Sequence, residues 1–295
     1  MIKEIKAKTI LSTVKNPSSW FGVMYNMNIY RGCEHKCIYC DSRSECYRIE
    51  SFDDIEVKVN AVDLLDLELS KKRKKGTVGT GAMSDPYTPI EKQYRLTQKA
   101  LKVLAENRYP VHITTKSNLI LRDVDILQEI NKIHASVAFT ITTTDNTIAQ
   151  KVEPNAPSPI ERLNAMGVLS TLGICTGITM MPILPFIEDN TNNIIEIVKL
   201  AKEFGASFIY PSFGMTLRDR QRNYYYEKIE RLFPGVKEKY EKSYGNYYCC
   251  NSKSVSKLKE AFFESCNKYG VSTKIPTYAN KLTSIQLSLF NDKDL

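Results

Sequence analysis

An alternation of strand-like and helix-like segments constrains the fold of this chain more than any other feature of its sequence. The strand-like segments are short, apolar and rich in β-branched residues, as is typical of buried parallel strands. We expect them at Met24–Tyr30, Thr77–Ala82, Val111–Thr115, Ser136–Thr143, Ile174–Met181 and Ser207–Tyr210. The amphipathic helices expected between them are Val62–Lys75, Gln93–Asn107, Asp123–Asn131, Ser158–Gly173 and Asn192–Phe204.

Six strand–helix units in sequence imply a parallel sheet with right-handed crossovers. A closed barrel of this kind has eight strands, so the count predicts an α/β fold with an open, partial (β/α)6 TIM-like barrel over residues 1–215. After residue 215 the pattern changes to helices and tyrosine-rich loops, without a Gly/Ser-rich linker. We therefore expect residues 216–295 to form a helical C-terminal extension that packs on the barrel.

The balance of charge is basic, with a formal net charge of +8 for 295 residues. Part of the excess is local, in the run Lys71–Lys75 and in Arg218, Arg220 and Arg222. Basic surfaces attract phosphate polymers, which leaves nucleic acid open as a partner. For Lys71–Lys75 alone we prefer a solvated helix end, because cations near a helix C-terminus are favoured by its dipole.

The sequence shows no segment that would hold the chain in a membrane. No apolar run approaches the roughly 20 residues that cross a bilayer, and the N-terminus lacks the apolar stretch of a secretory signal. We expect a cytoplasmic protein without a membrane partner. In that compartment the eight cysteines are better interpreted as thiols or metal ligands than as disulfides.

Three cysteines form a compact loop directly after the first expected strand. Cys33, Cys37 and Cys40 have the spacing C-x3-C-x2-C. Three thiolates on one short loop can hold three irons of a cubane and leave the fourth iron open to another molecule. The alternative is a zinc site with Cys46 or His35 as the fourth ligand, which is less favoured because zinc sites usually combine two separated pairs of ligands.

The triplet with an aromatic residue before its last cysteine, after the first strand of a six-fold βα series, resembles the radical S-adenosylmethionine (SAM) superfamily. The segments Gly79–Tyr87, Thr114–Ser117, Arg122–Asp123 and Glu153–Pro154 resemble its spore photoproduct lyase-like, DNA repair photolyase branch. The resemblance covers residues 24–270. It implies a [4Fe–4S] cluster, reductive cleavage of SAM to a 5′-deoxyadenosyl radical, hydrogen abstraction from a substrate, and an electron donor such as a flavodoxin or ferredoxin.

The same resemblance assigns cofactor-binding roles to residues at the strand ends. Tyr39 lies where the family places an aromatic side chain against adenine, and Lys116 could pair with the SAM carboxylate. The full set of candidates is Tyr39, Gly79, Gly81, Ser84, Lys116, Thr140 and Met181. Lys116 could equally be a solvated lysine at the top of the barrel. Asp85 and Glu153 are candidate polar groups at the mouth of the site or members of a structural ion pair.

One position departs from the pattern of the spore photoproduct lyases. Those enzymes have a cysteine after the second strand that returns a hydrogen atom to the product radical, and Ala82 stands at that position here. Repair of the thymine dimer itself is therefore in doubt. Cys175, Cys249 and Cys250 are the candidate substitutes, although Cys175 also suits a small core position.

The segment Gln286–Phe290 resembles the pentapeptide with which bacterial repair proteins bind the sliding clamp. Leu287, Leu289 and Phe290 would enter an apolar groove; the alternative is a terminal segment folded back on the barrel. For the whole chain we expect a lyase-like radical SAM enzyme that acts on a DNA lesion or a modified base. A small molecule, tRNA or peptide is the alternative substrate, and a non-catalytic, metal-binding, DNA-associated protein is the alternative of another class.

Overall fold

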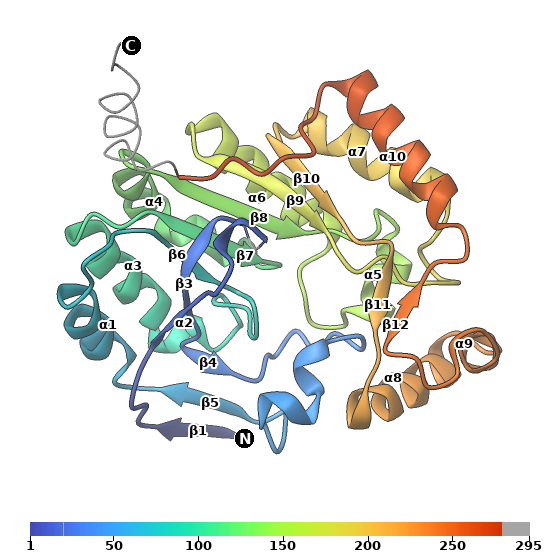
Figure 1. Cartoon of the computed structure of the whole chain (residues 1–295), viewed down its shortest axis with the longest axis horizontal. Coiled ribbons are helices and arrows are strands. Elements are labelled where there is room, and N and C mark those ends of the chain that lie inside the picture. The colour runs from blue at the N-terminus through green and yellow to red at the C-terminus, as the bar shows by residue number, and fades with distance from the viewer. Residues whose placement is uncertain (20, 279–295) are drawn as a thin grey trace, which may run out of the picture.

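Six parallel strands form the central sheet of the protein, whose computed structural model describes residues 1–19 and 21–278 (Figure 1). The strand order is β10-β9-β8-β7-β6-β3-β2, and the short edge strand β2 pairs antiparallel with β3. The bounds are β2 Leu11–Thr13, β3 Val23–Met27, β6 Thr77–Thr80, β7 Val111–Thr115, β8 Ala135–Thr140, β9 Cys175–Met180 and β10 Phe208–Pro211. This order confirms the predicted partial barrel.

Helices connect the parallel strands and lie along the outside of the sheet (Figure 1). They are α1 Ala61–Ser70, α2 Glu91–Tyr94, α3 Leu96–Glu106, α4 Val124–Asn131, α5 Asn146–Val152, α6 Pro159–Thr171 and α7 Thr191–Glu203. Short 3-10 turns lie at η1 Pro17–Ser19, η2 Asp41–Arg43, η3 Glu45–Tyr47 and η4 Asn118–Asp123. Every residue of β8 is buried, because this strand lies in the middle of the sheet and both its faces are covered.

The helix predicted to run to Lys75 ends at Ser70. A longer helix would stack like charges one turn apart, which is unfavourable. The lysines that follow α1 instead contact aromatic faces: Lys72 Nζ lies 4.9 Å from the centre of the Tyr25 ring, and Lys75 Nζ lies 5.4 Å from that of Tyr109. Lys71, Arg73, Lys74 and Lys75 are nevertheless exposed, so the run is a solvated loop that directly follows the end of α1.

A second sheet of three strands was missed by the sequence analysis. It has the order β1-β5-β4, with β1 Ile2–Ile5, β5 Ile55–Lys58 and β4 Tyr30–Arg31. The prediction of one strand over Met24–Tyr30 was wrong, since β3 ends at Met27 and Tyr30 pairs with β5. The apolar pattern continues across the break because Ile29 and Tyr30 are both buried. The cysteine loop, residues 33–40, thus follows β4.

The C-terminal extension contains helices and one additional strand pair. Its elements are β11 Gly214–Thr216, α8 Asp219–Leu232, α9 Val236–Tyr244, β12 Cys249–Asn251 and α10 Val255–Tyr269. The three helices confirm the predicted helical extension, and the antiparallel pair of β11 and β12 is an addition that the sequence did not predict. Helix α10 packs on α7 (Figure 1), and Arg220 of α8 donates hydrogen bonds to the carbonyls of Arg43 and Glu50.

Two predictions concern the tail and the membrane. The predicted clamp-binding segment Gln286–Phe290 lies outside the described residues. Across residues 1–19 and 21–278, no helix combines the length and the apolar character that crossing a membrane requires.

Candidate active site

A cavity of about 520 Å³ opens at the carboxyl ends of the parallel strands. This is the edge at which α/β barrels place their reactive groups. The cavity wall combines strand ends, the cysteine loop and the extension. Its lining includes Gly81–Asp85 after β6, Thr114–Lys116 of β7, Thr140 of β8, Met181 and Pro182 after β9, Ser212 after β10, and Thr216, Cys249 and Asn251 of the β11–β12 pair. The extension therefore completes the site.

The three predicted ligand cysteines all line this cavity. Their loop is tight: the amide of Lys36 donates to the carbonyl of Cys33, and the amide of Cys40 donates to that of Cys37. Lys36 takes the left-handed conformation with φ +56°, which turns the chain between the first two cysteines. At Gly32, φ is +82° and an added Cβ would lie 2.7 Å from the Asp54 carbonyl oxygen, so the entrance to the loop requires glycine.

The cysteine thiols are buried in a low-dielectric environment. Burial raises the pKa of Cys33 to about 12 and raises the pKa of Cys37 and of Cys40 as well. Protonated thiols of this kind are poor nucleophiles, because the thiolate is the reactive form. A bound cation would reverse this effect, since metal ligation deprotonates a thiol. The chemistry of the set therefore suits metal ligation better than nucleophilic catalysis.

The arrangement does not favour the zinc alternative. In the described part of the chain, no group of three or more His, Cys, Asp or Glu side chains is placed to hold a single metal ion, and this includes Cys33, Cys37 and Cys40. Cys46 is exposed, and the Nε2 atom of His35 faces Asp85. A cubane makes a different demand, because its thiolates bind separate irons rather than converge on one ion. The loop with three thiols around one cavity fits that demand.

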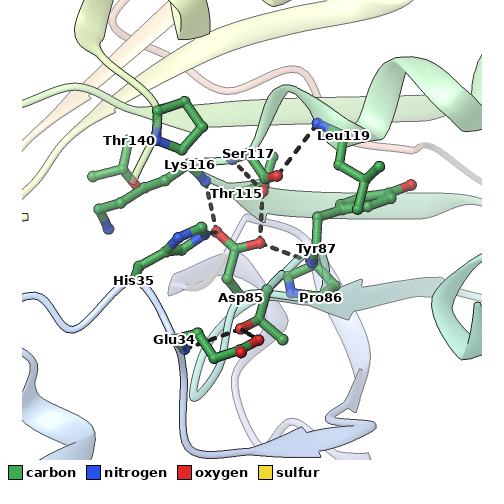
Figure 2. Close-up of polar contacts among 12 residues, drawn as sticks. Glu34, His35, Asp85, Pro86, Tyr87, Thr115, Lys116, Ser117, Leu119 and Thr140 are labelled. Atoms are coloured by element: carbon green, nitrogen blue, oxygen red, sulfur yellow. Dashed lines mark hydrogen bonds and ion pairs between the residues drawn. The ribbon is translucent and has the colours of Figure 1, made fainter. Parts of the chain in front are cut away.

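Asp85 connects the cysteine loop to the end of β7 (Figure 2). Its carboxylate accepts hydrogen bonds from Thr115 Oγ1 at 2.6 Å and from the Lys116 amide at 2.7 Å, and it lies 3.2 Å from His35 Nε2. Burial alone would raise the pKa of Asp85, but His35 and these donors hold it at about 2. The buried carboxylate thus stays ionised and fixes three segments around the cavity.

Glu34, the neighbour of His35, forms further hydrogen bonds that hold the loop (Figure 2). Its carboxylate accepts from the Ile90 amide at 2.6 Å and from Thr88 Oγ1 at 3.3 Å. Its own amide donates to Thr88 Oγ1 at 3.0 Å. The loop is therefore anchored to the segment before α2 as well as to β7.

A buried ion pair lies beside the cysteine loop. Glu153 Oε2 is 2.5 Å from Arg162 Nη2, and both side chains are 1% exposed. Glu153 also accepts from the Tyr39 hydroxyl and lies 3.8 Å from Lys116 Nζ. Burial would raise the pKa of Glu153, but Arg162 and Lys116 lower it below its usual range. The structural ion pair considered for Glu153 is thus present.

Lys116 lies inside the site rather than on its solvated rim. Its side chain is 16% exposed, and its Nζ is 5.6 Å from the centre of the Tyr39 ring. Burial lowers the pKa of Lys116, but Cys37 and Glu153 more than offset this and raise it above its usual value. A permanent cation therefore lies in the cavity next to the cysteine loop.

The structure brings most of the other predicted cofactor residues to the cavity. Ser84 Oγ is buried there without a hydrogen-bond partner among the described residues, which is a costly arrangement unless a ligand supplies one. Gly81 has φ +102°, and an added Cβ would lie 2.0 Å from the Thr114 carbonyl oxygen. Gly79 is outside this lining; it faces Val23 and a smaller hollow of about 130 Å³ that Thr140 and Met181 also line.

The three candidate hydrogen donors are separated by the fold. Cys249 lines the cavity, and its partner in the β11–β12 pair, Thr216, lines it too. Cys250 is buried, with its thiol directed to the Tyr247 carbonyl at 3.8 Å. Cys175 begins β9 and therefore lies at the edge of the sheet opposite the cavity. Ala82, the residue that replaces the expected cysteine, lines the cavity as well.

Several residues around the cavity were not predicted. Arg218 lies between two aromatic rings, with its guanidinium 5.6 Å from the centre of the Tyr47 ring and 5.2 Å from that of Tyr248. It also contacts Asp41 Oδ2 at 2.5 Å. Of these residues, only Asp41 could have been found from its position in the sequence, because it directly follows Cys40. Arg218 is far from Tyr47 and Asp41 in the sequence, and contacts between such distant residues produce no periodic pattern in the sequence.

A second unpredicted group is Glu188, whose carboxyl group accepts hydrogen bonds from the Thr142 hydroxyl and the Leu184 amide. Burial, together with the charge of Glu153, raises the pKa of Glu188 to about 8. The side chain is 1% exposed. No spacing in the sequence distinguishes it from its neighbour Asp189, which is half-buried.

Comparisons with known proteins agree with this geometry. The family profile described as the radical SAM superfamily matches residues 27–201. An uncharacterized protein of Methanocaldococcus jannaschii is 32% identical over 77% of this chain and 83% of that protein. The radical SAM Nalpha-GlyT isomerase of Pseudomonas phage M6 is 24% identical over 56% of this chain and 34% of that protein.

The fold is similar to that of solved structures. Spore photoproduct lyase complexed with dinucleoside spore photoproduct aligns with a TM-score of 0.67 and 15% identity, over 91% of this chain and 79% of that one. At this identity the likeness is one of fold. The alignment covers most of the barrel and of the extension.

Proposed function

Because the chain belongs to the radical SAM superfamily, we propose that Cys33, Cys37 and Cys40 hold a [4Fe–4S] cluster and that SAM binds in the cavity beside it. The chain is a radical SAM enzyme. When bound, the two groups would supply a 5′-deoxyadenosyl radical that abstracts hydrogen from a substrate. The observation that supports this most strongly is one cavity lined by three thiols, Lys116 and Ser84. Its volume of about 520 Å³ lies within the range of small-molecule sites.

The residues of the wall have separate tasks in this proposal. Lys116 offers a fixed positive charge to a carboxylate, and Ser84 Oγ offers a hydrogen-bond partner to a polar group that enters the cavity. Tyr39 presents a ring whose hydroxyl is fixed by Glu153. Gly81 lets the backbone approach Thr114 of β7 more closely than a residue with a Cβ could. Together these groups orient a charged ligand and exclude water.

For the substrate we propose a nucleobase in DNA or RNA. Tyr47 lines the cavity, and the guanidinium of Arg218 lies between the ring of Tyr47 and that of Tyr248. Tyr248 is 45% exposed, so part of its ring is open to a partner. Bases stack on such surfaces, and a base must leave its duplex before enzymes can react with it. The net charge of +8 agrees with a phosphate-bearing partner.

Cys249 is the proposed hydrogen donor of this chain, since Ala82 cannot serve. The S–H bond of Cys249 would break and a C–H bond would form on the substrate radical. This leaves a thiyl radical on sulfur. One electron from a low-potential electron-transfer protein and one proton from water would restore the thiol. Among the three candidate cysteines, Cys249 is the one that lines the cavity.

The test of this proposal uses the anaerobic, reconstituted protein with dithionite and SAM. Formation of 5′-deoxyadenosine is measured alone and with single-stranded DNA, duplex DNA, tRNA or a peptide mixture. Stimulation by nucleic acid supports the substrate class, and stimulation by peptide alone contradicts it. In D2O, a Cys249→Ala variant should lose transfer of deuterium into product while it still forms 5′-deoxyadenosine. A Cys250→Ala variant is the matched control.

The segment Gln286–Phe290 is proposed, from its sequence alone, to bind the sliding clamp. Deletion of residues 286–290 should abolish clamp binding in a pull-down assay and leave SAM cleavage unchanged. A full-length protein that does not bind the clamp would refute this proposal. That result would leave the proposal of radical SAM activity intact.

A further inference from the structure

A second hollow, of about 260 Å³, shares part of its wall with the active-site cavity. Ser212, after β10, and Asn251, of β12, line both the hollow and the cavity. The rest of the lining of the hollow is Pro211, Phe213, Val255, Lys259 and Phe263. We call it the α10 hollow, because the last three of these residues belong to α10. A ligand that extends from the cavity past Ser212 and Asn251 would enter it.

Helix α10 presents one aromatic ring and one positive charge to this hollow. Val255, Lys259 and Phe263 follow one another at intervals of four residues, so they lie along one face of the helix. Phe263 is 50% exposed, and Lys259 is exposed as well. Among the described residues that line the α10 hollow, Lys259 is the ionisable one. The hollow therefore combines an open aromatic surface with a single cation.

The ring of Phe263 is held in place by a cluster of aromatic side chains. The buried ring of Phe262 lies edge-on to it, with the ring centres 5.3 Å apart. Phe262 in turn contacts Phe213 in the same edge-on manner, at 6.0 Å. Helix α10 is itself packed on α7. A ring fixed in this way loses little freedom when a ligand stacks on its open surface, which favours binding.

We infer that the α10 hollow binds a nucleotide next to the reacting base of a single-stranded nucleic-acid substrate, with its base stacked on Phe263 and its phosphate paired with Lys259. This inference rests on the proposed function, which puts the reacting base in the cavity. Every base has an aromatic face and every nucleotide carries a phosphate, so one ring and one cation suit a flanking nucleotide of any sequence. The side-chain amide of Asn251, at the boundary of the two hollows, can donate and accept further hydrogen bonds.

The first test measures the affinity of the reconstituted, SAM-bound holoenzyme for a fluorescein-labelled oligothymidylate of about eight nucleotides, by fluorescence anisotropy. Phe263→Ala and Phe263→Leu should each raise Kd by about fivefold or more, because neither keeps an aromatic face. Phe263→Trp keeps one and should bind like the wild type. Val168→Ala, at a 44% exposed apolar position of α6, is the matched control and should leave Kd unchanged.

The second test examines Lys259 through the dependence of binding on salt. One phosphate contact on a single strand contributes about 0.7 to the slope of the logarithm of the binding constant against the logarithm of the salt concentration. Lys259→Gln should reduce the slope by about this amount and weaken binding at low salt. Lys102→Gln, at an exposed position of α3, is the matched control. Equal slopes for these two variants would contradict the pairing of Lys259 with a phosphate.

Formation of 5′-deoxyadenosine with dithionite and SAM, without oligonucleotide, separates this inference from the proposed function. All variants should form it at the wild-type rate, because none of the substituted residues lines the cavity. If the wild type forms none, the proposed function fails. If it does, but Phe263→Ala and Phe263→Leu bind the oligonucleotide as tightly as Val168→Ala, the inference is overturned. It is also overturned if the wild type binds no oligonucleotide, or if Phe263→Ala loses affinity only for a peptide mixture.

Discussion

The Nε2 atom of His35 lies 3.2 Å from Oδ2 of Asp85, and this contact joins the cysteine loop to the segment after β6. Asp85 also accepts from Thr115 and Lys116 of β7. An Asp85→Asn variant keeps the shape but removes the charge and one acceptor. We predict that the free energy of unfolding falls by about 2 to 4 kcal/mol in urea titrations, and that reconstituted iron content falls with it.

The control for that variant is Asp125→Asn, at an exposed position in the first turn of α4. Its loss should stay below about 0.5 kcal/mol. Equal losses in the two variants would mean that Asp85 does not anchor the loop. Normal iron content in Asp85→Asn would separate stability from ligand positioning.

The second prediction concerns the contribution of the buried pair of Glu153 and Arg162 to the free energy of unfolding. Glu153→Gln leaves a buried guanidinium without its counter-charge, and we expect a loss of about 3 to 5 kcal/mol in the free energy of unfolding. The double variant Glu153→Gln/Arg162→Met removes both charges and should recover part of that loss. A double variant less stable than the sum of the single variants would contradict an ion pair here.

Two glycines with left-handed backbones allow a matched comparison. At Gly81 an added Cβ would lie 2.0 Å from the Thr114 carbonyl oxygen, whereas at Gly173 nothing lies within 4 Å of it. Gly173→Ala should therefore cost only the backbone strain, about 1 to 2 kcal/mol. Gly81→Ala should cost at least about 3 kcal/mol and also impair SAM binding in calorimetry. Similar losses at the two positions would show that the close approach to β7 is unimportant.

We predict that the free energy of unfolding depends on pH through the buried carboxyl group of Glu188. Its pKa is about 8 in the folded chain against an ordinary value of 4.5, so between these values the folded state holds a proton that the unfolded state releases. The free energy of unfolding must then fall as the pH rises through this window. Measured from about pH 5 to about pH 8, the wild type should lose a few kcal/mol relative to Glu188→Gln, which does not titrate. Parallel pH curves would contradict a buried, protonated Glu188.

The parallel strands and the cysteine loop were predictable because their signals are local. Strand β7 is found at the predicted Val111–Thr115, where β-branched residues follow Pro110 and precede polar ones. The helix α6, expected over Ser158–Gly173, is found at Pro159–Thr171, and Ser158 and Glu161 form its capping box. The cysteine spacing required no knowledge of the fold. In each case one short segment contains the whole pattern.

The remaining parts of the site depend on contacts between distant segments. Strands β11 and β12 have three residues each and pair with one another across a segment that contains α8 and α9. That pairing places Cys249, rather than Cys250 or Cys175, at the cavity. Arg162 looks like an ordinary polar position of an amphipathic helix, and only the fold brings it to Glu153. Contacts between distant segments produce no repeating pattern in the sequence, so they could not be predicted from it.

The central claim is that the cysteine loop supports reductive cleavage of SAM. It is tested most directly by the yield of 5′-deoxyadenosine from the anaerobically reconstituted wild type and from Cys33→Ala/Cys37→Ala/Cys40→Ala, each with dithionite and SAM. The account predicts 5′-deoxyadenosine from the wild type, together with about four irons and four sulfides per chain, and neither from the triple variant. A wild type that binds zinc instead and forms no 5′-deoxyadenosine, or a triple variant that still forms it, would contradict the account.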